Sequence, residues 1–564
     1  MKKLITILIV LILIAAAGMG YYTFEYAKKM QPNDEVISKS ELFNVSGDQV
    51  AIMYNHSLQD PVGYYQDGQI YLPLTWTREN LNPRFYWDSS VEKLFYVLPT
   101  EIRTTDLTGR SAQGQPELLR KNNDLYLSLS LVTAYSDIAA TAFTNDEAKR
   151  VFIEDTWTSF ETASLTDDLM LRTGRSIKQR GIIPLDKGAR VRILRDYELD
   201  PDPNAPSADS DDSEADDEPW CRVRTEEGFT GYVPKKKLSS YDAVQPKSSF
   251  AAPEYTHISL GEPVVLGWHQ VSNMESNQSL NTLIKNAAPL NVISPTWFSL
   301  TDNSGNMDNF ISDEYIAAAH EQGLQVWALI DNFNENVNST ELLSNATARS
   351  NVISQLIASV TEHGIDGINI DFEQIKPEAS EAFIEFLREL SVSCRNHHIV
   401  LSVDDPNATL GNIYYNRRAQ AECVDYIINM GYDEHYAGGD AGSVSSFPFF
   451  KNGIDLSLAE VPADRFIAGL PFYTRIWQEE DGKTTSSSVG LGAAQQWIQD
   501  NAVALTWDNE LGQYVGFSEA GNIWLEDRES LTLKMDYIRE QNLGGVAGWR
   551  LGLETPETWE TIQF

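Results

Sequence analysis

The sequence predicts an α/β protein whose C-terminal part, residues 255–564, folds as a (β/α)₈ TIM barrel. Three observations support this fold class. Eight short apolar segments alternate with stretches of helical periodicity. Each segment has the length and apolar content of a buried parallel strand. Polar side chains fall at or near the ends of several of them, where a barrel of this kind places its chemistry. The expected strands are residues 264–271, 292–298, 326–330, 367–373, 399–403, 426–432, 466–472 and 545–551.

Residues 1–25 are predicted to form a transmembrane signal anchor. Lys2 and Lys3 precede an uncharged apolar run, residues 4–20, which is near the length that a helix needs to cross a bilayer. The two lysines should stay on the cytoplasmic side, so the rest of the chain is expected to be extracytoplasmic. A signal peptide cleaved near residues 15–17 is the alternative. In both cases we expect an exported protein, anchored to the cell membrane or secreted to the cell wall.

Residues 37–160 are predicted to form a small α+β module, because short alternating segments are broken by turn residues. An Asp-Gly turn followed by tyrosine and proline, and an aromatic run further on, resemble the amino-terminal domain of copper amine oxidases, which many bacterial surface proteins reuse. The residues that carry this resemblance are Asp67, Gly68, Tyr71, Pro73, Phe85, Tyr86, Trp87 and Asp88. No copper is implied, since His56 is the only histidine in this part of the sequence.

Residues 166–242 resemble a bacterial Src-homology-3-like (SH3-like) module, a small β-rich barrel. The resemblance is carried by Leu171, Arg172, Gly174, Leu185, Gly188, Val191, Ile193, Trp220, Arg222, Val223, Gly231, Tyr232 and Val233. Residues 197–219 are rich in Asp, Ser and Pro and are expected to be a disordered acidic insert. Calcium binding by this insert is a minor alternative. The resemblance implies targeting to cell-wall peptides, and a spacer role is the alternative.

Composition excludes one class of partner. The chain has 43 Lys plus Arg against 81 Asp plus Glu, a formal net charge of −38. This excess of negative charge repels phosphate backbones, so nucleic acid is not expected as a partner. The three cysteines, Cys221, Cys394 and Cys423, are too few and too widely spaced for a disulfide framework or a metal cluster. We expect buried thiols, with a Cys394 to Cys423 pair as the alternative.

The octapeptide at residues 366–373 indicates a functional site. Its alternation places Asn369, Asp371 and Glu373 on one face of a strand and the apolar side chains between them on the other. Burying an unpaired carboxylate costs free energy, so two of them on one strand face need a reason. A solvated edge strand is the alternative. The apolar helical stretches on both sides of this strand favour an interior parallel strand instead.

The string Asp-Gly-x-Asn-x-Asp-x-Glu at residues 366–373 resembles the signature of glycoside hydrolase family 18, the chitinase and N-acetylglucosaminidase family. Further matches in the expected order are Met430, Tyr432, Asp433 and Trp549. Residues 469–477 are similar to the branch of this family that cleaves peptidoglycan and spore cortex. The resemblance covers the whole expected barrel.

The residues and the resemblance together assign roles. Cleavage of a glycosidic bond needs an acid for the leaving oxygen, and Glu373 is the candidate, with a pKa raised by burial and a nearby carboxylate. Asp371 lies about 7 Å back along the same face, too recessed to attack the sugar. The resemblance implies that the substrate's 2-acetamido oxygen attacks instead. Asp371 would then orient the acetamido N–H, Tyr432 would bind the acetamido oxygen, and Trp549 would form the floor under the sugar.

Asn369 departs from the family pattern, which usually has aspartate there. An amide can hydrogen-bond Asp371 but cannot share a proton with it, so the coupled carboxylate pair is expected to be Asp371 with Glu373. Asp366 is expected to be structural. Other candidate substrate-binding residues besides Asn369 are Asp433, Tyr473, Arg475 and Trp297. A packing role for Tyr473 is an equal alternative, and Trp297 is expected to stack on a distal sugar.

The predicted function is a retaining, substrate-assisted glycoside hydrolase that cleaves β-1,4 bonds after N-acetylglucosamine in peptidoglycan. Its partners are expected to be a GlcNAc-containing glycan and, through the N-terminal helix, the membrane. No metal or organic cofactor is expected. The alternatives are a chitinase and a catalytically inert glycan-binding wall scaffold.

Overall fold

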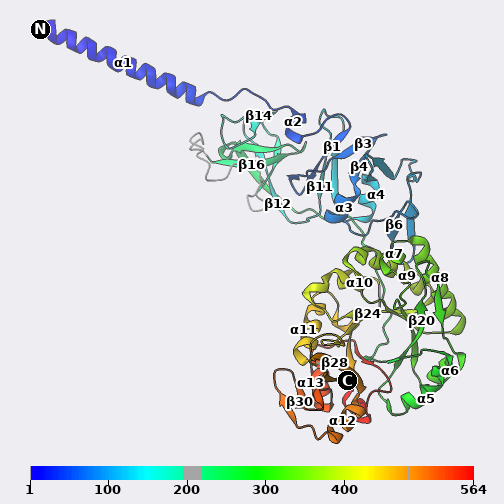
Figure 1. Cartoon of the computed structure of the whole chain (residues 1–564). Helices are drawn as coiled ribbons and strands as arrows, with labels where there is room; N and C mark the ends of the chain where they lie inside the picture. The colour runs from blue at the N-terminus through cyan, green and yellow to red at the C-terminus, as the bar shows by residue number, and fades with distance from the viewer. Residues whose placement is uncertain (1, 195–218, 481) are drawn as a thin grey trace. The chain divides into compact units, whose positions relative to one another are not determined.

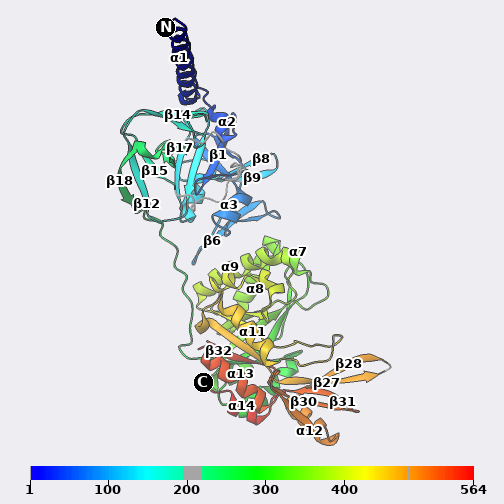
Figure 2. The ribbon, with the colours of Figure 1, turned by 90° about the vertical axis from the view of Figure 1, so that its left-hand side faces the viewer.

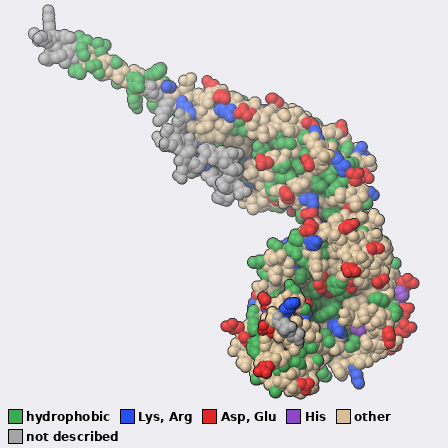
Figure 3. All heavy atoms as spheres, in the orientation of Figure 1, with side chains coloured by type: hydrophobic (Ala, Val, Ile, Leu, Met, Phe, Trp, Pro, Cys, Tyr) green, Lys and Arg blue, Asp and Glu red, His purple; other side chains and the backbone are tan. Residues whose placement is uncertain are grey.

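The computed structural model describes residues 2–194, 219–480 and 482–564, and the chain divides into two compact units (Figure 1). Unit 1 comprises residues 1–85 and 105–252, and unit 2 comprises residues 86–104 and 253–564. The expected acidic insert at residues 197–219 lies, except for Pro219, outside the described residues. Acidic side chains are more abundant than basic ones on the face drawn in Figure 3, in line with the net charge.

The chain begins with one long apolar helix, α1 (Lys2–Met30). Among the described residues it is the one helix long and apolar enough to cross a membrane, over Leu8–Lys28, by length and composition. Its apolar side chains, such as those of Leu11, Ile14 and Tyr22, are exposed in the isolated chain. This helix is therefore a candidate signal anchor.

Unit 1 contains two β-sheets. The strands of the first are β1 (Gln49–Tyr54), β2 (Ser57–Leu58), β3 (Gly63–Gln66), β4 (Gln69–Pro73), β8 (Leu118–Lys121), β9 (Asp124–Ser128), β10 (Ala139–Phe143) and β11 (Arg150–Glu154). Helices α2 (Lys39–Phe43), α3 (Leu74–Asn80) and α4 (Leu129–Tyr135) accompany it. The strands of the second sheet are β12 (Phe160–Leu165), β13 (Leu169–Arg172), β14 (Gly181–Leu185), β15 (Arg190–Ile193), β16 (Trp220–Thr225), β17 (Thr230–Pro234) and β18 (Leu238–Val244).

The two sheets of unit 1 share a hydrophobic core. Ala51 and Phe152 of the first sheet belong to the same buried cluster as Leu171 and Val233 of the second. Glu154 on β11 adds a polar contact, since its carboxylate accepts from Arg192 and Arg224 at 2.7 Å each. The two expected N-terminal modules thus pack as one unit. Their resemblance to an SH3-like barrel and to a copper-amine-oxidase module stays a prediction.

Unit 2 is built around a closed barrel of parallel strands, and its eight members correspond to the eight expected segments. They are β19 (Val264–His269), β20 (Val292–Leu300), β22 (Gln325–Asp331), β23 (Gly367–Asp371), β24 (Val400–Pro406), β25 (Tyr426–Met430), β26 (Phe466–Pro471) and β32 (Gly545–Trp549). Pairing of β19 with both β20 and β32 closes the cylinder. A short strand, β21 (Met307–Asn309), pairs antiparallel with β20. The predicted (β/α)₈ barrel is confirmed.

Helices cover the outside of the barrel (Figure 1). They include α5 (Leu280–Leu283), α6 (Asp313–Glu321), α7 (Ser339–Leu343), α8 (Ala346–His363), α9 (Ser380–His397), α10 (Arg417–Ala421), α11 (Phe447–Leu458), α13 (Arg528–Glu540) and α14 (Pro556–Thr561). The outward side chains of β23, Ile368 and Ile370, are fully buried against these helices. Period-two alternation therefore leaves Asn369 and Asp371 pointing into the barrel.

A subdomain that the sequence analysis did not predict interrupts the barrel after β26. It contains β27 (Tyr473–Glu480), β28 (Lys483–Gly490), α12 (Leu491–Asp500), β29 (Leu505–Asp508), β30 (Gln513–Ser518) and β31 (Gly521–Leu525). The strands form an antiparallel sheet in the order β28-β27-β31-β30-β29. The β27–β28 and β30–β31 hairpins project away from the barrel (Figure 2). Its first strand carries two of the predicted site residues, Tyr473 and Arg475.

Residues 86–104 pack with the barrel and not with the rest of the expected 37–160 module. They form a small sheet of β5 (Tyr86–Asp88), β6 (Lys93–Val97) and β7 (Ile102–Thr105). Arg349 of α8 is fully buried and bonds Asp88 at 2.9 Å and Glu389 of α9 at 2.8 Å. The aromatic run that begins at Phe85 is thus divided between the two units. The local sequence pattern does not indicate this division, because alternation shows that one face of a strand is buried but not which core buries it.

Replacing Arg349 by Met should destabilise unit 2 by about 3–5 kcal/mol, because two buried carboxylates lose their shared cation. The transition that unfolds this unit should move to lower temperature in calorimetry of the full chain. Arg528→Met is the matched control: Arg528 pairs with Glu560 at 3.3 Å on the surface, and its loss should cost less than about 1 kcal/mol. Equal effects of the two changes would contradict the structural role of Arg349.

The cysteines form no disulfide among the described residues. Cys394 and Cys423 are buried and Cys221 is partly exposed. Cys394 lies on α9, where burial raises the pKa of its thiol. The expectation of buried thiols therefore holds for Cys394 and Cys423, and no disulfide joins the two in the described part of the chain.

Candidate active site

The two central carboxylates lie where β23 ends. Asp371 is the last residue of the strand, and Glu373 follows two residues later in the loop at its carboxyl end. Glu373 therefore stands beyond the barrel rim and is partly exposed, whereas Asp371 is 5% exposed. Gln374, next in the chain, has φ of +53°, a left-handed conformation that non-glycine residues rarely adopt and that turns the chain sharply after Glu373.

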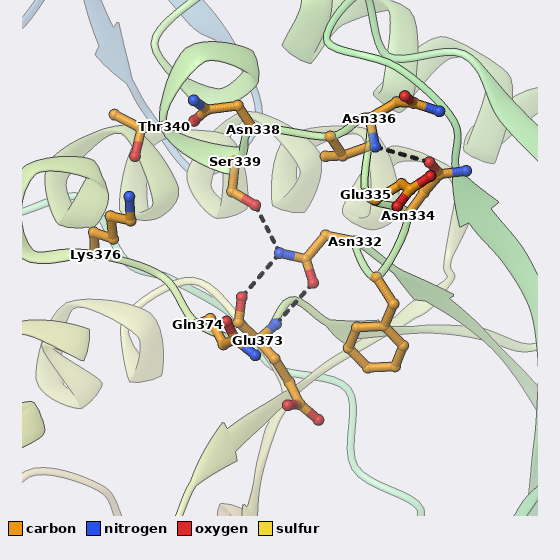
Figure 4. A pocket seen from close by; sticks show the side chains of 12 residues that line it. Asn332, Asn334, Glu335, Asn336, Asn338, Ser339, Thr340, Glu373, Gln374 and Lys376 are labelled. Atoms are coloured by element: carbon orange, nitrogen blue, oxygen red, sulfur yellow. Dashed lines mark hydrogen bonds between the residues drawn. The ribbon is translucent and has the colours of Figure 1, made fainter.

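Asn332 holds the backbone of Glu373 from both sides. Its Oδ1 accepts from the Glu373 N–H at 2.9 Å, and its Nδ2 donates to the Glu373 carbonyl at 2.9 Å. The same Nδ2 donates to Ser339 Oγ at 2.7 Å. These bonds leave the carboxyl group of Glu373 directed away from Asn332 (Figure 4). Asn332 thus fixes the position of the candidate acid without touching its carboxylate.

A pocket of about 610 Å³ adjoins Glu373. Its walls come from the loop after β22, the first residues of α7 and the loop after β23, and most of its side chains are polar and neutral. They include Asn332, Asn334, Asn336, Asn338, Ser339, Thr340 and Gln374, with Glu335 and Lys376 as charged members. Amide and hydroxyl groups of this kind suit a ligand rich in hydroxyl and acetamido groups.

Asn369 is fully buried beneath Asp371, and its amide has a fixed orientation. Its Oδ1 accepts from Trp268 Nε1 at 3.0 Å and from Ser294 Oγ at 3.1 Å. Its Nδ2 donates to Asp404 Oδ1 on β24 at 2.8 Å. The expected hydrogen bond from Asn369 to Asp371 is therefore replaced by one to Asp404. The neighbouring parallel strand β24 places this second carboxylate within hydrogen-bond distance of the amide.

Asp371 is flanked by other carboxyl groups. Asp331 of β22 is its register partner on one side, and Asp404 lies on β24 on the other. Burial raises the pKa of Asp371 well above its usual value, and then Asp404, Glu373 and Asp331 raise it further. The expected coupled pair of Asp371 with Glu373 is thus corrected, because Asp404 acts on Asp371 more strongly than Glu373 does.

The pKa of Glu373 is raised as well. Burial is the main cause, followed by the negative charges of Asp433 and Asp331. A carboxyl group with a raised pKa keeps its proton toward neutral pH and can give it to a leaving oxygen. This electrostatic environment is what a general acid requires.

Aromatic side chains cluster at the carboxyl ends of β19, β25 and β32. Trp268 of β19 packs edge-on against Trp549 of β32, with ring centroids 5.9 Å apart, and against Tyr432 at 6.5 Å. Tyr432 in turn contacts Tyr473 at 6.3 Å. Tyr432 and Trp549 are partly exposed over the buried Trp268. An apolar surface of this type can hold the face of a sugar ring.

Asp433 connects the cleft with the inserted subdomain. It follows Tyr432 with φ of +60°, and its carboxylate accepts from Tyr473 Oη at 2.5 Å. Arg475 approaches the same carboxylate at 3.9 Å and donates to Ser486 Oγ at 3.2 Å. Tyr473 is only 4% exposed, so it orients Asp433, whose own side chain is half exposed.

Trp297 does not reach the cleft. It is fully buried, donates from Nε1 to Asn277 Oδ1 at 2.9 Å, and packs against Tyr315 of α6. Trp297 points outward from β20 toward the surrounding helices, and the predicted stacking on a distal sugar is wrong. Asp366 has the expected structural role, since its carboxylate accepts from the Val326 N–H at 2.8 Å and pairs with His320.

Three site residues escaped the sequence analysis: Asn332, Asp331 and Asp404. Asp331 and Asn332 follow one expected strand directly, and Asp404 follows another. The position of polar residues at strand ends is a signal that could have found all three. In the described part of the chain, no group of three or more His, Cys, Asp or Glu side chains is arranged to hold a metal ion.

A barrel whose open end holds a half-buried acid, a recessed carboxylate and an aromatic wall is typical of enzymes that hydrolyse glycosidic bonds. The family described as glycosyl hydrolases family 18 matches residues 267–554, about half of the chain. The chain belongs to this family and is one of its glycosidases.

Several proteins resemble this chain over the barrel. The "Uncharacterized glycosylase YvbX" of Bacillus subtilis is 26% identical over 302 residues, which is 50% of this chain and 87% of the relative. The "Cortical fragment-lytic enzyme" of Bacillus subtilis is 27% identical over 231 residues, 39% of this chain and 54% of the relative. The chain thus spans about half the length of the second relative. The solved spore cortex-lytic enzyme SleL of Bacillus cereus aligns with a TM-score of 0.48 and 21% identity, covering 57% of this chain and 77% of SleL.

Proposed function

We propose that this glycosidase cleaves β-1,4 bonds after N-acetylglucosamine in peptidoglycan, with retention of configuration and with the substrate's own acetamido group as nucleophile. The observation that carries the proposal is the pairing of a partly exposed Glu373, whose pKa is raised, with a recessed Asp371. Glu373 stands in the loop after β23, where it could reach a leaving oxygen, and Asp371 is buried at the end of that strand. The protein nucleophile of an ordinary retaining enzyme has no counterpart in this arrangement.

In the proposed first step, Glu373 donates its proton to the glycosidic oxygen as the bond to the anomeric carbon breaks. The acetamido oxygen of the same sugar attacks that carbon and forms an oxazolinium ring. Glu373, now ionised, then removes a proton from water, which opens the ring from the face that the leaving group occupied. Two inversions at one carbon give net retention.

The acetamido group and its sugar ring would be held by three side chains, those of Asp371, Tyr432 and Trp549. Asp371 would accept a hydrogen bond from the acetamido N–H and stabilise the positive charge that develops there. The hydroxyl of Tyr432 would donate to the acetamido oxygen and hold it in line for attack. Trp549 would support the apolar face of the sugar. The amide-rich pocket beside Glu373 would hold the next sugar on the leaving-group side.

Three features support peptidoglycan as the substrate and a location outside the cytoplasm. A relative that shares the barrel is named a cortical fragment-lytic enzyme. The helix α1 has the length and composition of a membrane anchor, and its first two residues are lysines. The SH3-like pattern of residues 166–242 is the third, since modules of that kind commonly engage wall peptides. We therefore propose an exported enzyme, anchored in the cell membrane or secreted to the wall.

Digestion of purified peptidoglycan by the full-length chain, in detergent, tests the substrate and the bond. Products reduced with borohydride and weighed by mass spectrometry should carry reduced N-acetylglucosamine at their ends. Reduced muramic acid there would contradict the assigned bond. Proton NMR early in the reaction should show the β-anomer first, whereas the α-anomer would contradict retention.

Digestion of colloidal chitin in parallel distinguishes the proposed function from the two alternatives, a chitinase and an inert glycan-binding scaffold. Faster release from chitin than from peptidoglycan would favour a chitinase. Absence of release from both, with binding retained, would favour an inert glycan-binding scaffold. A thiazoline mimic of the oxazolinium ion should inhibit the active enzyme competitively, and failure to do so would remove the substrate-assisted step.

A further inference from the structure

We propose that Asp404, on β24, takes up the proton of Asp371 during the reaction, and so supplies from the neighbouring strand the carboxylate that Asn369 does not provide. Asp404 is a positioning residue in this scheme, because it acts on substrate through Asp371. The inference rests on the proposed function, in which Asp371 must be ionised when it meets the acetamido N–H.

The strand register places the two side chains together. Parallel pairing of β23 with β24 joins Asn369 to Ser402 and Ile370 to Val403. Asp371 and Asp404 occupy the next position on their strands. Laterally adjacent residues of a parallel sheet project to the same side, so both carboxyl groups point into the barrel. Asp404 is 1% exposed. It is therefore shielded from bulk water, unlike a carboxylate on the surface.

Asn369 and Trp268 supply hydrogen bonds to Asp404, whereas one oxygen of Asp371 is left without a bond in the described part of the chain. Asp404 Oδ1 already accepts from Asn369 Nδ2 at 2.8 Å, which assigns any proton to its other oxygen, Oδ2. Asp371 Oδ1 is buried and has no hydrogen-bond partner among the described residues. Two adjacent buried carboxylates cannot both be charged without a large cost, and one shared proton removes it. Burial raises the pKa of both carboxyl groups, and the negative charge of Asp404 raises that of Asp371 further, in agreement with this geometry.

The other charged groups around the pair are less suited to this role. Asp331 of β22 faces Asp371, but its Oδ1 accepts from Ser299 Oγ at 2.7 Å and from the Phe333 N–H at 3.1 Å. Glu373 is the acid and must keep its own proton for the leaving oxygen. Asp433 lies half exposed at the rim, beside Tyr432.

Trp268 of β19 donates its indole N–H to Asn369 and carries no charge. Asp405, next to Asp404 on β24, points to the opposite face of that strand. There Asp405 contacts Arg417 Nε at 3.2 Å and accepts from Gln420 at 3.1 Å.

The proposed proton path balances. In the resting site one proton lies between Asp371 Oδ1 and Asp404 Oδ2, and the pair carries one negative charge. As the acetamido N–H approaches, the proton moves onto Asp404 and Asp371 becomes the anion. Attack of the acetamido oxygen and departure of the leaving oxygen use the proton of Glu373. When water has opened the oxazolinium ring and product leaves, the pair returns to its resting arrangement.

Asp404→Asn tests the inference, because the amide can still accept from Asn369 but cannot take up a proton. With the full-length chain and soluble wall fragments, kcat should fall by at least about tenfold with little change in KM. The acid limb of the kcat/KM profile should move to higher pH. A pair that shares one proton gains its second proton only at low pH, whereas a lone buried carboxyl is protonated at higher pH.

The exchange variant Asn369→Asp with Asp404→Asn returns a carboxylate next to Asp371 from its own strand. It should recover most of the lost kcat and return the acid limb toward the wild-type position. Asp405→Asn is the matched control on the same strand. It weakens a buried ion pair on the opposite face of β24, so it should lower Tm, and kcat should fall much less than in Asp404→Asn.

A wild-type rate and pH profile in Asp404→Asn, or a folded exchange variant no better than the single variant, would overturn the inference. Failure of the proposed function looks different. In that case the wild-type chain itself releases no N-acetylglucosamine ends, whatever residue stands at position 404.

Discussion

Glu373→Gln should lose at least about three orders of magnitude in kcat while the chain stays folded. Glutamine has nearly the same shape as protonated glutamic acid, and the Asn332 bonds to the backbone of residue 373 do not involve the side chain. The amide has no proton to give at ordinary pH, so the leaving oxygen departs unprotonated. Release of reducing ends from peptidoglycan measures the loss, and an unchanged Tm verifies the fold.

Glu378→Gln is the matched control for this change. Glu378 is an exposed glutamate five residues further along the same loop region, outside the cleft. Its replacement should leave kcat and KM within about twofold of wild type. Turnover by Glu373→Gln above a few per cent of wild type would remove Glu373 as the acid, and a comparable loss in Glu378→Gln would point to damage of the loop.

The pH dependence follows from the raised pKa of Glu373. Because the reaction needs the protonated acid, kcat should decline as pH rises through that pKa. The decline should lie above the pH at which an ordinary glutamate loses its proton.

Asp371→Asn should be the second most damaging change, with a loss of about 10²-fold or more in kcat. The neutral amide cannot compensate the positive charge of the oxazolinium ring, so the transition state loses its electrostatic partner. The thiazoline mimic should also bind the variant more weakly than the wild type. If both rate and inhibitor affinity stay near wild type, Asp371 does not act on the intermediate.

The same substitution should stabilise the fold at neutral pH. Asp371 has a folded-state pKa above its unfolded value, so its contribution to stability is fully present below the unfolded pKa, about 3.9, and is lost as pH rises through the folded pKa. Asparagine does not titrate. The Tm of Asp371→Asn relative to wild type should therefore increase between pH 4 and pH 7. A constant difference across this range would show that Asp371 is not under electrostatic strain.

Local pattern was sufficient for the barrel strands and for the octapeptide. Each expected strand overlaps an observed one, because burial on both faces demands a continuous apolar run that ends where the strand ends. The inward projection of Asn369 and Asp371 follows from period two alone. The inserted subdomain after β26 was not predicted, since its strands mix buried with exposed positions and β28 is mostly exposed and polar, as a loop would be.

The sequence by itself determined the closed barrel, the anchor-like first helix, and the placement of Asp371 and Glu373 on one strand and loop, because alternation and apolar length act within a few residues of the chain. Only the tertiary structure decided what those carboxylates meet. In the folded chain Asp331, Asn332 and Asp404 of the neighbouring strands and loops lie beside β23 or the loop after it. Trp297 points outward, and residues 86–104 pack with the barrel. These outcomes depend on strand register and on which buried faces pack together. They could not be predicted, because a contact between distant segments does not change the periodicity of either segment.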